Sequence, residues 1–204
     1  MDIDIVGEDS VTQAIIARLV RAIRPDLAIK NRLPARGGQI RRLAPSYNNL
    51  NTPVFLLTDL DQYPCPPSLL KDWFGEGGIK AHMLFRVAQE EAETWLMADR
   101  VGFSNWLNVS TELIPQPTII DAEKGIAEII LPIKPSLFLM RSIASQSPNS
   151  DLREHLTPKL GAKKGPGYNV AMLHFIEKIW SFEDASNNST SLAGTIDRLR
   201  NFAP

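Results

Sequence analysis

The feature that most constrains the fold is one short and almost purely apolar segment, residues 53–58, which reads Pro-Val-Phe-Leu-Leu-Thr. It lacks the strict alternation of apolar and polar residues that marks a half-exposed strand. A near-continuous apolar run of this length is typical of a strand covered on both faces, as in a parallel sheet. Asp59 and Asp61 follow it directly. The segment therefore predicts a buried strand with acidic residues at its carboxyl end.

The segments around this strand alternate between strand and helix patterns. Residues 3–6 predict a first strand that ends at Gly7, and residues 28–33 and 81–87 predict two more. Between the first two of these strands, apolar residues at helical spacing predict a helix that Ser10 caps, with Gln13 completing a capping box. This order predicts an α/β fold of the Rossmann-like kind, in which helices flank a mainly parallel sheet.

Beyond about residue 110 the pattern changes to one that is mainly helical. Proline, glycine and Ser/Asn-rich breaks separate the segments that we expect to be helices, which are residues 121–131, 136–145, 168–180 and 191–202. We therefore expect two domains, a sheet-containing domain over residues 1–110 and a helical C-terminal extension over residues 111–204 that packs on it.

Three acidic residues stand where a parallel sheet would gather its functional groups. Ligands bind at the carboxyl ends of such strands; Glu8 follows the first predicted strand, and Asp59 and Asp61 follow the buried one. Clustered carboxylates favour a hard cation with oxygen ligands. In an extended segment, residues two apart point the same way, so Asp59 and Asp61 would both face the metal. We predict a Mg²⁺ (or Mn²⁺) site here; a polar turn beside a helix start is the simpler alternative.

This arrangement resembles a known family. A strand ending in glutamate, a helix, and an apolar strand ending in D-x-D resemble the TOPRIM domain of primases, topoisomerases and OLD-type nucleases, over roughly residues 1–100. Many TOPRIM proteins have glycine directly after the glutamate, whereas here Gly7 precedes Glu8 and Asp9 follows it. The resemblance implies a TOPRIM-like fold and metal-dependent chemistry on phosphodiester bonds, with Glu8, Asp59 and Asp61 as catalytic and metal-binding residues.

A second segment extends the resemblance. Residues 91–99 read Glu-Ala-Glu-Thr-Trp-Leu-Met-Ala-Asp and are similar to the E-x-E-x-W…A-D helix of an uncharacterised bacterial TOPRIM-like family, found near ATPase and phage-defence genes. The family pattern implies that Glu93 is a further catalytic residue, with Glu91 as the next candidate, and that an ATPase is a partner. The simpler alternative is a solvated acidic rim beside a buried Trp95.

Two basic segments are candidates for contact with nucleic acid. Residues 18–42 contain eight basic side chains against one acid, Asp26, and include a glycine-rich loop. Residues 159–168 combine lysines and glycines with Tyr168, which would stack on a base. A solvated helix face and a surface loop are the simpler alternatives. The residues that we predict to contact nucleic acid are Arg36, Arg41, Arg42, Lys163 and Lys164.

The composition limits how the chain could bind nucleic acid and in which cellular compartment we expect it. The net charge of −1 excludes a chain-wide basic footprint, so nucleic acid would be bound through local patches. The single cysteine, Cys65, allows no disulfide within the chain and favours a reducing compartment. The N-terminus is unlike a signal peptide, and no apolar run is long enough to span a bilayer. We expect a cytoplasmic protein without membrane contact.

These observations favour a Mg²⁺-dependent nuclease, a phosphodiester hydrolase that acts on nucleic acid and serves in phage defence with an ATPase partner. The main alternative is a non-catalytic or partner-activated TOPRIM subunit that binds nucleic acid or an ATPase. A third hypothesis is a phosphorylated receiver domain with Asp59 as phosphoacceptor, in which Asp61 would have no role. The sequence leaves open DNA or RNA as the substrate, activity without a partner, and a homodimer.

Overall fold

The structure, a computed structural model, describes residues 1–35 and 38–203. It divides into two compact units. The first unit comprises Met1–Gln89 together with Ala193–Pro204, and the second unit comprises Glu90–Leu192. This division differs from the expected one in two places, because the second unit begins near residue 90 and the last helix of the chain returns to the first unit.

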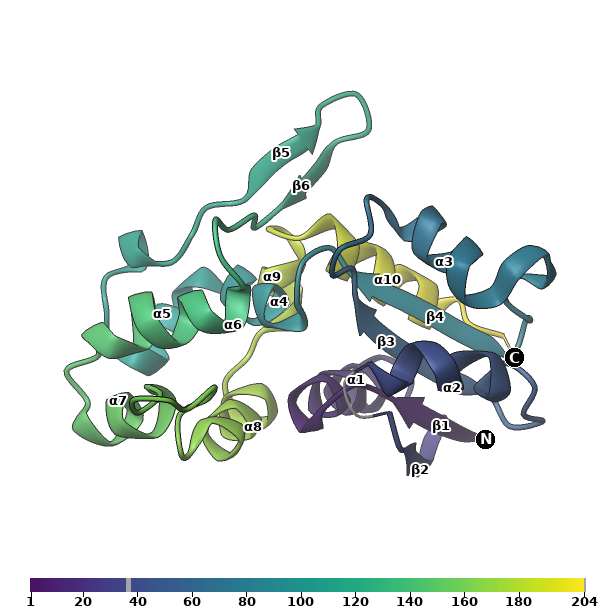
Figure 1. Ribbon diagram of the computed structural model, residues 1–204, viewed down its shortest axis with the longest axis horizontal. Coiled ribbons are helices and arrows are strands. Elements are labelled where there is room, and N and C mark those ends of the chain that lie inside the picture. Colours follow the sequence, from purple (N-terminus) through teal and green to yellow (C-terminus); the bar gives the residue numbers. More distant parts are fainter. Residues whose placement is uncertain (36–37, 204) are drawn as a thin grey trace. The chain divides into compact units, whose positions relative to one another are not determined.

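The first unit is built on a four-stranded parallel sheet with the order β2-β1-β3-β4 (Figure 1). All three strand pairings are parallel. The expected α/β class, with helices flanking a parallel sheet, is thus confirmed. The strands are β1 (Asp2–Val6), β2 (Ala28–Leu33), β3 (Val54–Asp59) and β4 (Met83–Ala88).

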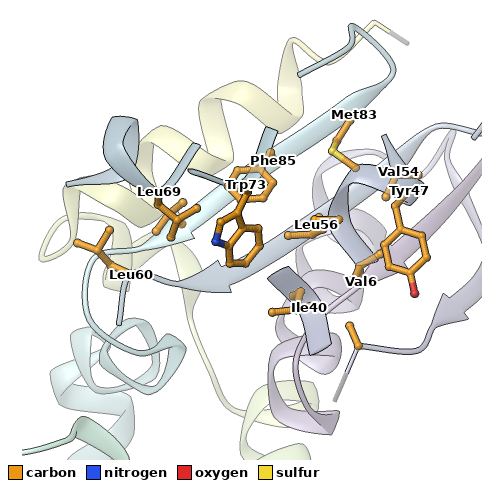
Figure 2. Close-up of a cluster of buried hydrophobic side chains, with 13 residues drawn as sticks. Val6, Ile40, Tyr47, Val54, Leu56, Leu60, Leu69, Trp73, Met83 and Phe85 are labelled. Carbon is orange, nitrogen blue, oxygen red and sulfur yellow. The ribbon is translucent and has the colours of Figure 1, made fainter. Parts of the chain in front are cut away.

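Helices cover both faces of this sheet. One face packs against α2 and α3 through the cluster of buried side chains in Figure 2, which includes Leu56, Trp73 and Phe85. The opposite face packs against α1. The helices of the first unit are α1 (Ser10–Ile23), α2 (Gln39–Tyr47), α3 (Pro66–Phe74), the 3-10 turn η1 (Gly75–Gly77) and most of α10 (Thr190–Arg200).

The apolar run of β3 lies at the centre of this arrangement. Val54, Phe55, Leu56 and Leu57 are all fully buried, which confirms a strand covered on both faces. Successive side chains of a strand point to opposite faces, so the run supplies both cores at once. β3 is also an inner strand, with β1 on one side and β4 on the other.

The last helix, α10, lies on the α1 face of the sheet. The Arg86 guanidinium of β4 donates from Nε to the Thr195 hydroxyl at 3.0 Å. Arg24, which follows α1, donates from Nη1 to the Leu199 carbonyl at 3.3 Å. Because Leu199 is fully buried, this end of the chain contributes to the core of the first unit.

The second unit is mainly helical, and the indole rings of Trp95 and Trp180 are buried within it. Among the described residues, no helix is both long enough and apolar enough to cross a membrane. The elements of the second unit are α4 (Ala92–Ala98), α5 (Arg100–Leu107), η2 (Thr111–Leu113), β5 (Thr118–Asp121), β6 (Ile126–Glu128), α6 (Pro135–Phe138), the π-helical η3 (Leu139–Ile143), η4 (Ala144–Gln146), α7 (Ser150–Leu156), α8 (Tyr168–Lys178) and α9 (Phe182–Ser186).

The helix expected over residues 121–131 is wrong, because β5 and β6 form an antiparallel hairpin there. β5 contains two adjacent isoleucines, Ile119 and Ile120, and β-branched residues favour extended backbone. Gly125 in the connecting turn has a φ of +64°, which glycine adopts without strain. The short apolar pattern did not distinguish a helix from a strand.

Candidate functional site

The carboxyl ends of β1 and β3 lie at the same edge of the first unit's sheet. The two strands pair in parallel, with Val6 opposite Leu56. Glu8 follows shortly after the end of β1, and Asp59 is the last residue of β3. Two of the three predicted metal-binding carboxylates are thus carried by neighbouring strand ends.

A hydrogen bond ties Glu8 to β3. The Thr58 hydroxyl donates to Glu8 Oε1 at 2.9 Å, and Thr58 is only 1% exposed. A buried hydroxyl that lacks an acceptor is costly, so this bond holds both side chains in place. Because Thr58 directly precedes Asp59, the bond brings the Glu8 carboxylate to the strand end that carries Asp59. The sequence pattern did not single out Thr58, although a hydroxyl at the end of an apolar run could have indicated a residue of the site.

Gly7 lets the chain pass from β1 into α1 at close range. A Cβ at this position would lie 2.9 Å from Cγ2 of Thr12 and 3.0 Å from the backbone nitrogen of Gln13, both too short for van der Waals contact. The glycine before Glu8 therefore has a steric role of its own. It allows α1 to start against the strand end and places Glu8 in the turn between them.

The predicted capping box at the start of α1 is wrong. The N-cap is Asp9, whose Oδ1 accepts from the backbone nitrogen of Thr12 at 3.0 Å. Aspartate caps a helix as well as serine does, and it stands one residue before Ser10. The Gln13 side chain donates instead to the Gly7 carbonyl at 3.3 Å. Asp9 thus serves the helix start, while its neighbour Glu8 bonds to β3.

Asp59 is the last residue of β3 and Asp61 lies in the loop after it, so the two aspartates are not both part of one extended segment. Between them, Leu60 is 4% exposed and packs in the cluster of Figure 2, and its backbone nitrogen donates to the Ala88 carbonyl at 2.9 Å. Asp61 is exposed and has a φ of +50°, in the left-handed region. β3 ends at Asp59 and the backbone of Asp61 is left-handed, so strand alternation does not apply to this pair of aspartates.

A small polar network supports the loop that follows Asp61. The Tyr63 hydroxyl donates to Asp72 Oδ2 and accepts a hydrogen bond from the Trp73 indole at 3.2 Å. The hydrogen bond to the Asp72 carboxylate raises the pKa of the Tyr63 phenol above its ordinary value. Arg41 donates to the other Asp72 oxygen at 2.9 Å. The loop is thereby tied to α2 and α3.

The chemistry of this edge suits a hard cation, although the carboxylates are not gathered into a closed cage. Within residues 1–35 and 38–203, no group of three or more His, Cys, Asp or Glu side chains is close enough to hold a metal ion. Mg²⁺ usually takes only one or two protein carboxylates and completes its shell with water and phosphate oxygens. Such an open site needs only two protein carboxylates, and the neighbouring strand ends of β1 and β3 carry two, Glu8 and Asp59.

In the second unit, the predicted catalytic residue Glu93 is buried, with 6% of its surface exposed. The Tyr168 hydroxyl donates to Glu93 Oε1 at 2.8 Å. Tyr168 is only 1% exposed, so the prediction that its ring stacks on a base is wrong. The acceptor of this hydrogen bond lies far away in the sequence, on α4. The ammonium group of Lys164 lies 4.7 Å from the centre of the Tyr168 ring.

Glu91 and Asp99, the other acids of this motif, bind neighbouring backbone. Glu91 forms an ion pair with Lys134 at 3.1 Å and accepts from the backbone nitrogen of Ser136 at 2.8 Å. Asp99 is 2% exposed and accepts from the backbone nitrogens of Gly102 and Ser181, each at 2.9 Å. Asp99 thus caps α5 and fixes the residue that precedes α9.

The basic residues predicted to contact nucleic acid have different surroundings. Arg36 lies outside the described residues. Arg41 is bound to Asp72, whereas Arg42 is exposed and makes no hydrogen bond or ion pair with any residue that the structure describes. Lys163 is also exposed and makes no hydrogen bond or ion pair with a described residue, whereas Lys164 contacts the Tyr168 ring.

Comparison of the chain with models of protein families, with curated proteins and with solved structures finds no match in any of the three.

Proposed function

We propose that the chain is a Mg²⁺-dependent phosphodiester hydrolase of the nuclease type, that its first unit is a TOPRIM-like domain, and that it acts on nucleic acid in the cytoplasm. The observation that supports this most is the Thr58 to Glu8 hydrogen bond, which joins the end of β1 to the strand end that carries Asp59. A role in phage defence with an ATPase partner follows only from the family resemblance.

In this proposal, Glu8 and Asp59 would hold the cation, and Asp61 would complete its ligands from the loop. When bound, Mg²⁺ would neutralise charge on the scissile phosphate and favour ionisation of an attacking water. Thr58 orients the Glu8 carboxylate by donating to one of its oxygens. Glu93 is proposed as a further acidic residue of the reaction, and its orientation depends on the Tyr168 hydroxyl.

The basic side chains would position the nucleic acid backbone. Phosphate contacts fix register and orientation without reading sequence. Arg42 and Lys163 suit this task because both are exposed and form no ion pair within the described part of the chain. Arg41 suits it less, because Asp72 already neutralises its charge.

Cleavage assays with carboxylate variants test the proposal. Wild-type protein should cleave DNA or RNA in Mg²⁺ or Mn²⁺, and Glu8→Gln and Asp59→Asn should each abolish cleavage while leaving the folded state intact. Asp2→Asn is the matched control, because Asp2 is an exposed aspartate at the start of β1, the strand that Glu8 follows. The hydrolase proposal fails if Glu8→Gln and Asp59→Asn both keep wild-type rates.

A partner-activated subunit is the second candidate function. The lack of a preformed group of three carboxylates among the described residues favours it, because an incomplete metal site can require a partner or substrate to finish it. In that case the purified chain would cleave nothing alone and would cleave when an ATPase partner is added. The same Glu8→Gln and Asp59→Asn variants would then abolish the partner-dependent activity.

A further inference from the structure

The loop between α7 and α8 (Figure 1) contains a fully exposed leucine, Leu160. Residues 159–162 form a tight turn in which the Ala162 nitrogen donates to the Lys159 carbonyl at 2.9 Å. Gly161 has a φ of +80°, the value that a type II turn requires at its third position. Leu160 therefore occupies the second, outward corner, and its relative exposure is 107%.

The same turn is strongly cationic. Residues 159–168 contain three lysines and no acidic residue. Lys159 and Lys163 flank Leu160 and form no ion pair with any residue in the described ranges, while Lys164 lies over the Tyr168 ring. An exposed apolar side chain flanked by Lys159 and Lys163 suits an anionic surface that also offers an apolar slot.

The base of the loop is held firmly although its tip is exposed. The Gly167 nitrogen donates to the His155 carbonyl at 3.0 Å, and a Cβ on Gly167 would lie 2.6 Å from the His155 ring. Tyr168, the next residue, is buried and bonded to Glu93. A loop anchored in this way loses little conformational freedom when its tip binds a ligand.

We infer that Leu160 is an apolar wedge that enters between stacked bases of a nucleic acid while Lys159 and Lys163 contact the flanking phosphates. This inference rests on the proposed function only in taking nucleic acid as the ligand. Inserted apolar side chains of this kind unstack a base step in proteins that bend DNA, and the phosphates on either side supply the charge that the lysines need.

An anionic membrane would match the charge but not the apolar area. Stable attachment to a bilayer takes more than one apolar anchor or an acyl chain combined with a basic patch. The tip offers one leucine side chain, which is enough to fill the gap at a single base step. Charge complementarity together with this small apolar area favours nucleic acid.

The test measures base unstacking in EDTA, so that no cleavage occurs. Oligonucleotides that carry one 2-aminopurine, which brightens when it is unstacked, are prepared as duplex DNA and as RNA. Wild-type protein should raise the fluorescence of at least one of them, Leu160→Ser should abolish the rise, and Leu160→Met should keep it. Lys163→Gln should lower the slope of log affinity against log salt by about one.

Val101→Ser is the matched control, because Val101 is another exposed apolar side chain of the second unit, 63% exposed. The inference is overturned if Leu160→Ser raises the fluorescence as wild type does, or if the protein binds neither oligonucleotide. It is also overturned if Leu160 is needed for binding to phosphatidylserine vesicles and not for unstacking. Cleavage in Mg²⁺ is scored separately with Asp59→Asn, so a failed wedge and a failed hydrolase give different results.

Discussion

Thr58 lies near the end of the apolar strand β3, at the edge of the sheet that carries Glu8 and Asp59. A small β-branched side chain suits a buried strand, and its buried hydroxyl needs an acceptor there. Glu8 supplies that acceptor from a different strand end. One residue thus serves both the core and the candidate site, and the two roles can be separated by substitution.

Replacing Thr58 with valine should separate its role in the core from its role at the candidate site. Valine keeps the shape of the side chain but removes the donor, so we expect stability to change by only about 1 kcal/mol. Affinity for Mn²⁺ should fall by roughly ten- to a hundredfold, as for other residues that orient a ligand. Thr58→Ser, which keeps the hydroxyl, should retain most of the affinity. Equal Mn²⁺ affinity in Thr58→Val and wild type would show that Thr58 is only a core residue.

Glu128 is a buried acid, 2% exposed, that the sequence did not single out. It accepts from the Ser189 hydroxyl at 2.7 Å and from the backbone nitrogen of Ser191. Burial raises the pKa of its carboxyl above the ordinary value of 4.5, and the hydrogen bonds from the two serines partly oppose this. The contribution of Glu128 to stability is therefore fully present below about pH 4.5 and is lost as pH rises through the folded-state pKa.

Glu128→Gln tests this pH dependence. Denaturant unfolding at several pH values above 4.5 should show that the variant gains stability relative to wild type as pH rises, because glutamine carries no charge to bury. A stability difference between the two proteins that stays constant across the same pH range would contradict the account.

At the scale of elements, the junction between α4 and α5 depends on one aspartate and one glycine. The Asp99 carboxylate folds back over the first turn of α5, and a Cβ on Gly102 would overlap it. The E-x-E-x-W…A-D motif therefore covers α4 and ends at Asp99, the residue at which α4 and α5 meet. The A-D ending of the motif is thus explained by capping.

Gly102→Ala should reverse the usual effect of this substitution in a helix. Alanine normally stabilises a helix by roughly 1 kcal/mol relative to glycine, but here it displaces the Asp99 cap, and we expect a loss of about 1–3 kcal/mol. Gly77→Ala is the control, because nothing lies within 4 Å of a Cβ at that position. Thermal unfolding compares the two variants, and a stabilised Gly102→Ala would rule out the steric account.

At the scale of the whole molecule, the chain's last helix completes the first unit. Leu199 of α10 is fully buried, whereas the next residue, Arg200, is exposed. Leu199→Ala should lower the free energy of unfolding by about 2–5 kcal/mol. Arg200→Ala should change it by less than about 0.5 kcal/mol. Equal effects in denaturant titrations would mean that α10 is not part of the core.

The sequence predicted the parallel sheet and the strand ends that carry Glu8 and Asp59, because apolar runs and their polar ends are local signals. The left-handed backbone of Asp61 was not predictable, since D-x-D spacing does not reveal where a strand stops. Nor was the burial of Tyr168, because its partner Glu93 is 75 residues away. Local patterns thus indicated the candidate site, while contacts between residues far apart in the sequence decided which polar side chains are buried.

The central claim is that Glu8 and Asp59 form one metal site at the edge of the sheet. Titration of Mn²⁺ followed by electron paramagnetic resonance tests it without any substrate or partner. We predict that wild-type protein and Asp2→Asn bind Mn²⁺, and that Glu8→Gln and Asp59→Asn each lose this binding. Wild-type protein that binds no Mn²⁺, or both carboxylate variants binding it as wild type does, would contradict the claim.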